Sequence, residues 1–377
     1  MFLDNKLCQD YDESNLTHTW APNENINIES DCAHIWCGGK TLDQVCPPGL
    51  IDHWTKLNKD AKSHLNSIKH AKISLDDVCF YDLVPESFLI DFYGLKNKIC
   101  EHVFQSHDRP KNHKFLHDLI LFCKALEKRN LNLNFANLNL ADSNVKKGFS
   151  KIKKYSPTIR YDAWGTATGR LTTKKDSFPI LTLNKELRPA IVPSNDLFVE
   201  FDFNAAELRV LFGLLGQEQP CDDIHTWINK NIFESKYDRE TSKKKVFSWL
   251  YNPKAKNKKL NGYLDRNRIY EQYYVGNKVE TPYGRSLEVE EQKAVNFLIQ
   301  STSSDMFMTS ALVVNEILKG KKSYIAFCIH DSLVIDFSAE DRKHLLHLKE
   351  SFSKTKFGQL RTNLRIGKNF GTMREIV

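Results

Sequence analysis

The sequence predicts an α+β fold, and three features lead to this prediction. A partly alternating, aromatic-rich run at 197–203 is typical of a strand, and the Ala- and Leu-rich run at 205–216 closes on a glycine, as a helix does. Two apolar runs within 324–337 predict a β-hairpin with an acidic residue at its tip. Apolar residues at helical spacing predict helices within 85–135 and across 290–318.

Length and composition leave several function classes open. The chain has 377 residues, enough for two or three subdomains with a sizeable core. Its formal net charge of +7 permits a nucleic-acid partner without requiring one. No apolar run reaches membrane length, and the acidic N-terminus is unlike a signal peptide, so we expect no membrane partner. Because the nine cysteines show no regular spacing, we expect free thiols in a reducing cytoplasm.

The first 75 residues are weakly patterned, and the sequence assigns them no function. Cys32, His34, Cys37 and Cys46 are possible zinc ligands, but their spacing matches no paired CxxC arrangement. A zinc site is therefore not favoured.

The next part of the chain is helical and then basic. Within 85–135, one helix begins at Pro85 and a second amphipathic helix covers 115–130. An alternating run at 131–144 predicts a strand or an irregular ladder. The basic run at 145–154 is more typical of a solvated face than of a binding site.

A glycine- and threonine-rich run follows at 165–173. Its two glycines and four threonines predict a turn or hairpin that brings the backbone close to a partner. Arg170 in such a turn could reach a phosphate or a base edge, and an ordinary hairpin with an exposed arginine is an equally good interpretation.

Two aspartates lie at predicted strand ends. Asp202 falls where the central strand gives way to a helix, and Asp331 lies at the tip of the 324–337 hairpin. Taken alone, Asp202 is typical of a cap or turn acid. If the two strands are neighbours in one sheet, however, the carboxylates converge, and a divalent cation would relieve their repulsion.

A stripe of four side chains runs along a predicted helix at 239–251. Arg239, Lys243, Phe247 and Tyr251 are each four residues apart, so they wind slowly along one face. Two cations can hold a polyphosphate, and two aromatic rings can pack on a sugar and a base. An amphipathic helix with core aromatics would explain the rings but not the cations. Ten basic residues against two acidic ones between 239 and 268 also suit a polyanion.

The C-terminal part holds further polar candidates. Residues 281–285 (TPYGR) predict a turn between strands. Asn296 and Gln300 lie on the predicted helix at 290–318, where amides could contact a minor groove or solvent. A helix at 340–353 and a last strand at 364–373 complete the chain.

With these motifs in this order, residues from about 155 to the C-terminus resemble a family A (polymerase I-like) DNA polymerase of compact phage type without an exonuclease domain. The resemblance implies a right-hand fold, with a thumb, a palm built on an antiparallel sheet, and helical fingers. The implied parts are an N-terminal segment of unknown role at 1–75, a thumb-like helical region at 76–160, the first part of the palm at 161–210, the fingers at 211–274, and the second part of the palm at 275–377.

The resemblance also implies roles in catalysis. VEFDFNAAELRV at 199–210 is similar to the first palm motif, which makes Asp202 a metal ligand and the Phe203 carbonyl a second ligand. The same motif places Glu207 against the 2′ position of the sugar. His330 and Asp331 match the last palm motif, so Asp331 becomes the partner ligand.

The 239–251 stripe matches the fingers helix of the family at every spacing. The match implies that Arg239 and Lys243 bind the triphosphate, with Lys243 the general acid for pyrophosphate. It implies that Phe247 packs on the incoming sugar and that Tyr251 stacks at the template position. His225 joins the nucleotide-binding set by the same resemblance. The residues implied in DNA binding are Thr168, Arg170, Arg285, Asn296, Gln300 and His330.

The implied activity is template-directed addition of deoxynucleotides to a primer 3′ end with two Mg²⁺ ions, in replication or repair. The expected partners are primer–template DNA, dNTPs and a separate exonuclease or processivity factor, and the expected state is a monomer, in the host cytoplasm if the chain is phage-encoded. Two departures matter, because Ser332 stands where the family has Glu and Asn252 stands where it has Gly. A single-subunit RNA polymerase, reverse transcription and a catalytically quiet DNA-binding relative remain alternatives.

Overall fold

The structure is a computed structural model in which the chain divides into two compact units, residues 1–113 and 114–377. The boundary falls within the helical region 76–160, at the start of its second helix, so the two helices predicted there lie mainly in different units. The described residues are 32–376 except Ser74, Asp76, Asp77, Cys79 and Pro253, together with the backbone of β1 (Phe2–Leu3) and β2 (Lys6–Leu7). Within this part, no helix is both long enough and apolar enough to cross a membrane.

The first unit is helical. Its helices are α1 (Ala33–Trp36), α2 (Leu42–Val45), α3 (Ile51–His70) and α4 (Glu86–Ser106). Buried Trp54 and Leu57 on α3 pack against Leu95 and Ile99 on α4, and Trp54 stacks on Phe92 with ring centroids 5.4 Å apart. The helix predicted to begin at Pro85 is confirmed, with Pro85 as its N-cap.

Cys32, Cys37 and Cys46 are free thiols, and the described residues contain no group of three or more His, Cys, Asp or Glu side chains placed to hold a metal ion.

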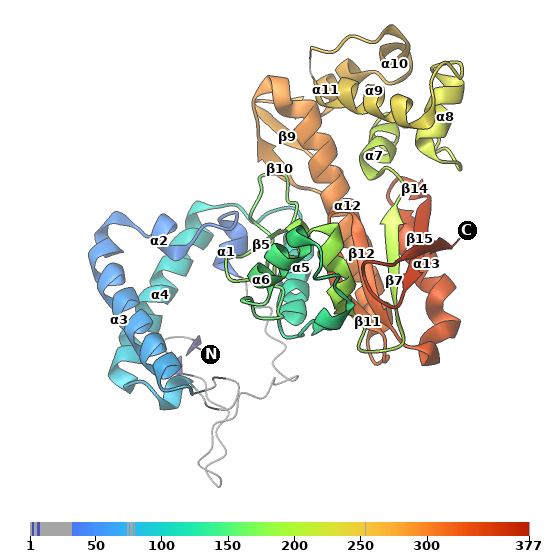
Figure 1. The fold of residues 1–377 in the computed structure, drawn as a ribbon. Helices are drawn as coiled ribbons and strands as arrows, with labels where there is room; N and C mark the ends of the chain where they lie inside the picture. Colours follow the sequence, from blue (N-terminus) through green and yellow to red (C-terminus); the bar gives the residue numbers. More distant parts are fainter. Residues whose placement is uncertain are drawn as a thin grey trace. The chain divides into compact units, whose positions relative to one another are not determined.

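The second unit combines helices with one main sheet (Figure 1). Its helices are α5 (His113–Glu127), α6 (Ser143–Ile152), α7 (Ala206–Leu214), α8 (Ile224–Asn231), α9 (Arg239–Tyr251), α10 (Lys258–Tyr263), α11 (Arg266–Tyr273), α12 (Ala294–Leu318) and α13 (Leu345–Ser353).

The main sheet has five antiparallel strands in the order β11-β12-β7-β15-β16. They are β7 (Leu197–Phe203), β11 (Tyr324–Ile329), β12 (Ser332–Phe337), β15 (Thr362–Gly367) and β16 (Arg374–Ile376). A smaller sheet joins β8 (Tyr274–Val275), β9 (Lys278–Glu280) and β10 (Ser286–Glu288). The remaining pairs are β3 (Asn132–Leu133) with β6 (Ile191–Val192), β4 (Tyr161–Asp162) with β5 (Thr172–Thr173), and β13 (Lys354–Thr355) with β14 (Gly358–Gln359).

The two faces of β7 have different surroundings. Phe201 and Phe203 pack on Phe352 of α13, and Phe307 of α12 contacts the same ring, so these helices cover one face. Because side chains alternate along a strand, Asp202 lies on the opposite face. Asp202 is half-buried, whereas both of its neighbours in sequence are buried.

Several sequence predictions are confirmed with small shifts. The strand at 197–203, the hairpin within 324–337 and the helix at 239–251 appear as predicted. The long helix begins at Ala294, after a short 3₁₀ turn, and the 340–353 helix divides into a 3₁₀ turn and α13. The run at 131–144 is an irregular ladder, with only two residues in β3.

Candidate active site

Asp202 and Asp331 lie at neighbouring strand ends. Strand β12 pairs with β7 in a register that sets Ser332 opposite Asp202, and Asp331 precedes Ser332 in the turn of the hairpin. The predicted convergence of the two strands is therefore confirmed. His330 begins this two-residue turn with a φ of 51°, a left-handed conformation that a non-glycine residue adopts at an energetic cost.

Burial makes this carboxylate pair ready for a cation. Burial raises the pKa of Asp202 to about 6; the negative charges of Glu200 and Asp331 add to the effect, and a hydrogen bond from Ser332 opposes it. Burial also raises the pKa of Asp331. The Ser332 hydroxyl donates to Asp202 Oδ1 at 2.9 Å. Two partly desolvated carboxylates at neighbouring strand ends favour either a retained proton or a bound cation.

Glu207, in the 199–210 run, contacts two other predicted residues. Ala205, with a φ of 53°, turns the chain from β7 into α7, and Glu207 lies buried in the first turn of that helix. Its carboxylate accepts hydrogen bonds from the Arg170 guanidinium and from the Tyr251 hydroxyl. Burial raises the pKa of Glu207, and Arg170 partly offsets this rise. Three segments far apart in sequence thus meet at one carboxylate.

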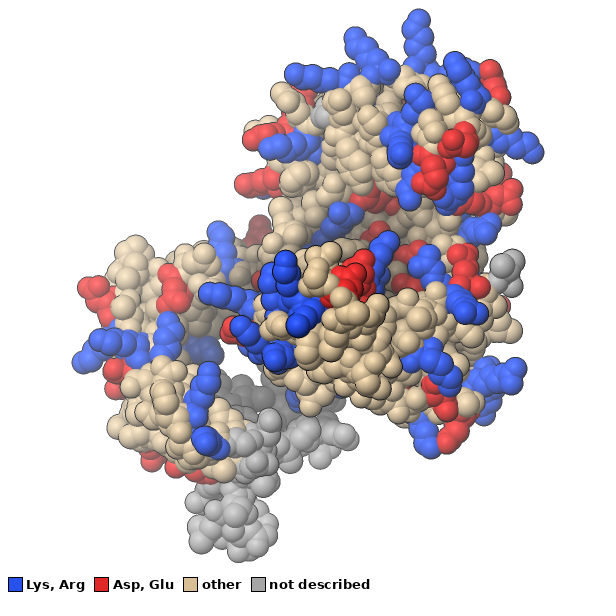
Figure 2. Space-filling view, viewed as in Figure 1, with Lys and Arg blue, Asp and Glu red and all other residues tan. Residues whose placement is uncertain are grey.

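Helix α9 carries the predicted stripe. Asp238 caps its N-terminus by accepting from the Thr241 amide, and the rings of Phe247 and Tyr251 stack with centroids 5.8 Å apart. Asn296 of α12 donates to the Tyr251 carbonyl at 3.2 Å. Gln300 lies half-buried one turn further along α12. Lys and Arg side chains gather over α9 to α11, in the upper part of Figure 2, in agreement with the basic excess of this segment.

His225 is buried beside the stripe. Its ring lies 5.5 Å from that of Phe247, and its Nδ1 atom has no hydrogen-bond partner among the described residues. Burial lowers the pKa of His225 to about 4; Asp223 and Glu240 oppose this shift, and the Arg239 and Lys243 charges add to it. The imidazole is therefore neutral at neutral pH.

This buried imidazole should make stability depend on pH. The unfolded chain gains a proton at His225 below about pH 6.5, whereas the folded chain gains it only near pH 4, so the free energy of unfolding falls as the pH drops through this window. We expect His225 to account for a loss of about 2 kcal/mol between about pH 7 and about pH 4.5. Urea unfolding of the natural chain and of His225→Gln at both pH values measures it. An equal pH dependence in both proteins would contradict the assignment.

The side chains of Arg285 and Thr168 are buried, whereas a side chain that contacts DNA directly has to be exposed. Arg285 donates through Nε and Nη2 to Asp305, with a shortest distance of 2.7 Å, and only 8% of its side chain is exposed. Its guanidinium lies directly under Gly169, where a Cβ atom would come within 2.5 Å of Arg285 Cζ. Gly169 has a φ of 76°, so glycine is required here on two grounds. The Arg285 guanidinium therefore packs against the backbone of the 165–173 turn at Gly169.

A cavity of about 320 Å³ opens beside Asp331. Its lining combines charged and polar groups with apolar ones from α12 and from other segments. The lining residues are Thr166, Arg170, Leu171, Leu181, Ser304, Phe307, Met308, Cys328, His330 and Asp331.

Sequence reasoning missed three contributors to the site. Ser332 seemed only a departure from a motif, yet its hydroxyl holds Asp202. Glu200, buried two residues before Asp202, pairs with Arg365 at 3.5 Å. Asp223 binds Arg239 at 2.8 Å, and the one available signal was its position as the N-cap of α8.

Comparisons with known proteins identify the fold. The polymerase domain of Pol1 from M. smegmatis, solved with DNA primer-template and dNTP, matches 74% of this chain with a TM-score of 0.51 and 15% sequence identity. The chain has a polymerase fold. It spans 55% of the length of that solved chain. No protein-family model matches the sequence, and no curated protein is significantly similar to it.

Proposed function

We propose that this chain is a template-directed DNA polymerase that adds deoxynucleotides to a primer 3′ end, in replication or repair. The observation that carries the proposal is the pairing of β12 with β7, which places Asp202 and Asp331 at neighbouring strand ends, while Glu207 at the start of α7 accepts a hydrogen bond from Tyr251 of the cationic, aromatic helix α9. The sheet of β7, β11, β12 and β15 would form the palm and α8 to α11 the fingers. The region 76–160 would supply the thumb.

The donor set fits magnesium. Asp202, Asp331 and the Phe203 carbonyl offer the hard oxygen ligands that Mg²⁺ prefers, and burial, which raises the pKa of both carboxyls, leaves them partly desolvated. Two bound Mg²⁺ ions would activate the primer 3′-hydroxyl and stabilise the leaving pyrophosphate. Ser332 would keep Asp202 oriented through its hydrogen bond.

The α9 side chains would hold the nucleotide. Arg239 and Lys243 would bind the triphosphate, and Lys243 would donate a proton to the departing pyrophosphate. His225 would belong to the nucleotide site through its ring contact with Phe247. Phe247 would pack on the sugar, and Tyr251, 40% exposed, would stack at the template position.

Contacts with DNA would surround the cavity beside Asp331. The cavity would receive the primer terminus, and Arg170 and His330 line it. Asn296 and Gln300 would lie against the minor groove, whose acceptors amides can read. Thr168 and Arg285 would act through the shape of the 165–173 turn. DNA affinity should therefore fall as salt rises.

One primer-extension experiment tests the proposal. A primed DNA template is incubated with Mg²⁺ and either dNTPs or rNTPs, with a matched or a mismatched 3′ end. We expect Mg²⁺-dependent extension with dNTPs from the matched end. Binding of primed DNA without any extension would instead support a catalytically quiet relative.

One observation favours a second candidate, a single-subunit RNA polymerase. Ser332 follows His330 and Asp331, a pattern that resembles that class more than a DNA polymerase. Glu207 favours a deoxynucleotide substrate over a ribonucleotide. Its buried carboxylate accepts a hydrogen bond from the Tyr251 hydroxyl and would crowd a 2′-hydroxyl on the incoming sugar. Preferential incorporation of rNTPs would overturn our choice.

Replacing Glu207 should relax the choice of sugar. In Glu207→Ala the carboxylate is gone and space opens beside Tyr251, so we expect discrimination against rNTPs to fall by roughly tenfold to a hundredfold. The measurement is kcat/KM for dNTP and rNTP on one primed template. Glu207→Gln is the matched control, since it keeps the volume and should keep most of the discrimination. Unchanged sugar selectivity in Glu207→Ala would refute the role.

A further inference from the structure

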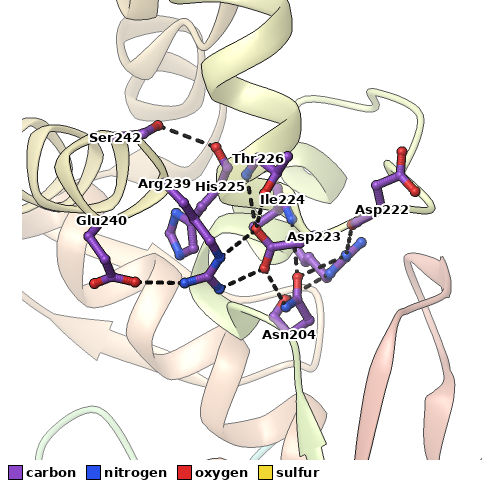
Figure 3. Close-up of polar contacts among 10 residues, drawn as sticks. Asn204, Asp222, Asp223, Ile224, His225, Thr226, Arg239, Glu240 and Ser242 are labelled. Atoms are coloured by element: carbon purple, nitrogen blue, oxygen red, sulfur yellow. Dashed lines mark hydrogen bonds and ion pairs between the residues drawn. The ribbon is translucent and has the colours of Figure 1, made fainter. Parts of the chain in front are cut away.

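A chain of hydrogen bonds joins the first palm motif to the N-terminus of α9 (Figure 3). It begins at Arg209, whose side chain is fully buried in α7. Arg209 donates to the Asn204 carbonyl at 2.8 Å and to Asn204 Oδ1 at 3.2 Å. Its other hydrogen bonds go to the carbonyls of Pro220 and Asp222. Asn204, two residues after Asp202, is thereby fixed in position and orientation.

Asp223 is the next member of the chain, and both of its oxygens are occupied. Oδ2 accepts from Asn204 Nδ2 at 3.0 Å and from Arg239 Nη2 at 2.8 Å. Oδ1 accepts from Arg239 Nε at 3.1 Å and from the backbone and side chain of Thr226. Although burial opposes ionisation, these donors hold the pKa of Asp223 well below its usual value. The carboxylate is thus a fixed anion with no spare lone pair of good geometry.

The Arg239 guanidinium has a half-buried acidic partner on one side and an exposed one on the other. Nε and Nη2 meet the Asp223 carboxylate, and 19% of the Asp223 side chain is exposed. Among the residues that the structure describes, Nη1 meets only Glu240, at 2.8 Å, and 66% of the Glu240 side chain is exposed. An exposed pair between adjacent residues contributes little free energy, so an incoming anion can displace Glu240 far more easily than Asp223.

We propose that Asp223 is a positioning residue that orients the Arg239 guanidinium so that Nη1 receives a phosphate oxygen of the incoming nucleotide. The proposal rests on the polymerase function proposed above. Binding a triphosphate exchanges Glu240 for phosphate at Nη1 and leaves the Asp223 fork intact. Because Asp223 also accepts a hydrogen bond from Asn204, the orientation of Arg239 is fixed relative to the turn that follows Asp202. The proposed phosphate-binding and metal-binding residues are thereby held in fixed positions relative to each other.

Three substitutions each remove one negative charge from this neighbourhood and separate positioning from simple electrostatics. Asp223→Asn breaks the fork, Glu240→Gln alters the displaceable partner, and Asp222→Asn changes an exposed neighbour whose carbonyl alone takes part in the chain. If only charge mattered, all three would bind a triphosphate more tightly. Positioning predicts that Asp223→Asn binds it roughly tenfold more weakly, while the other two change affinity by about twofold or less.

The experiment measures the Kd of dATP with Mg²⁺ for the full chain bound to a template whose primer ends in a dideoxynucleotide, so no turnover is needed. Asp223→Asn is also made on an Arg239→Ala background, where it should have no further effect on Kd. A general loss of folding would weaken binding on both backgrounds. An unchanged or lower Kd in Asp223→Asn, or an equal effect without Arg239, overturns the inference. Absence of primer extension by the natural chain would instead refute the polymerase function.

Discussion

Asp202→Asn and Asp331→Asn should each reduce primer extension by roughly three orders of magnitude while leaving primed-DNA binding nearly intact. Asparagine keeps the volume of the side chain and, at position 202, an acceptor for the Ser332 hydroxyl, so the sheet edge should keep its shape. What it removes is the charge that a divalent cation requires. The measurement is the single-turnover rate of extension at saturating dNTP, with DNA affinity from fluorescence anisotropy.

The matched control for this experiment is Glu200→Gln. Glu200 lies on the same face of β7, two residues before Asp202, and is also buried and acidic. It pairs with Arg365, so neutralising it changes the local charge by the same amount without removing an expected ligand. We expect extension to fall by about tenfold or less. Near-normal extension by either asparagine variant, or an equal loss in Glu200→Gln, would contradict the assignment of the two aspartates.

The elements that place the site follow from local patterns in the sequence. Alternation at 197–203 and the two apolar runs of the hairpin are enough to predict the strands, because one face of each must be buried. The pairing of β12 with β7 was conditional in the sequence, and the register that sets Ser332 opposite Asp202 shows that it forms. The four-residue spacing likewise fixes the stripe on α9, since a helix brings such residues to one face.

Side-chain contacts between residues far apart in the sequence could not be predicted from such local patterns. Nothing in the sequence shows that Asp223 takes Arg239, sixteen positions later, or that Ser332 binds Asp202 across the sheet. Such pairs depend on which charged groups the packing brings together and desolvates. Arg285 illustrates the limit, because a turn between strands predicts exposure, whereas Asp305 on the neighbouring helix α12 draws its guanidinium inward.

Arg285→Met should lower the free energy of unfolding by about 3–5 kcal/mol, because it strands a buried carboxylate. The Asp305 side chain is only 1% exposed, and burial raises its pKa while Arg285 opposes the rise. Without the guanidinium, Asp305 can escape the cost only by taking a proton. The loss of stability should therefore be smaller at low pH than at neutral pH. Urea unfolding at both pH values measures it.

The double variant Arg285→Met with Asp305→Leu separates support of the fold from contact with DNA. An apolar pair of similar volume removes the stranded charge, so we expect most of the lost stability to return. Because the Arg285 guanidinium supports Gly169, the single variant should also bind primed DNA more weakly through the displaced 165–173 turn. If Arg285 acts only by filling the space under that turn, the Met and Leu side chains can fill it once the stranded charge is gone, and the double variant recovers DNA affinity together with stability. A stable double variant that still binds DNA poorly would show that the guanidinium contacts DNA itself.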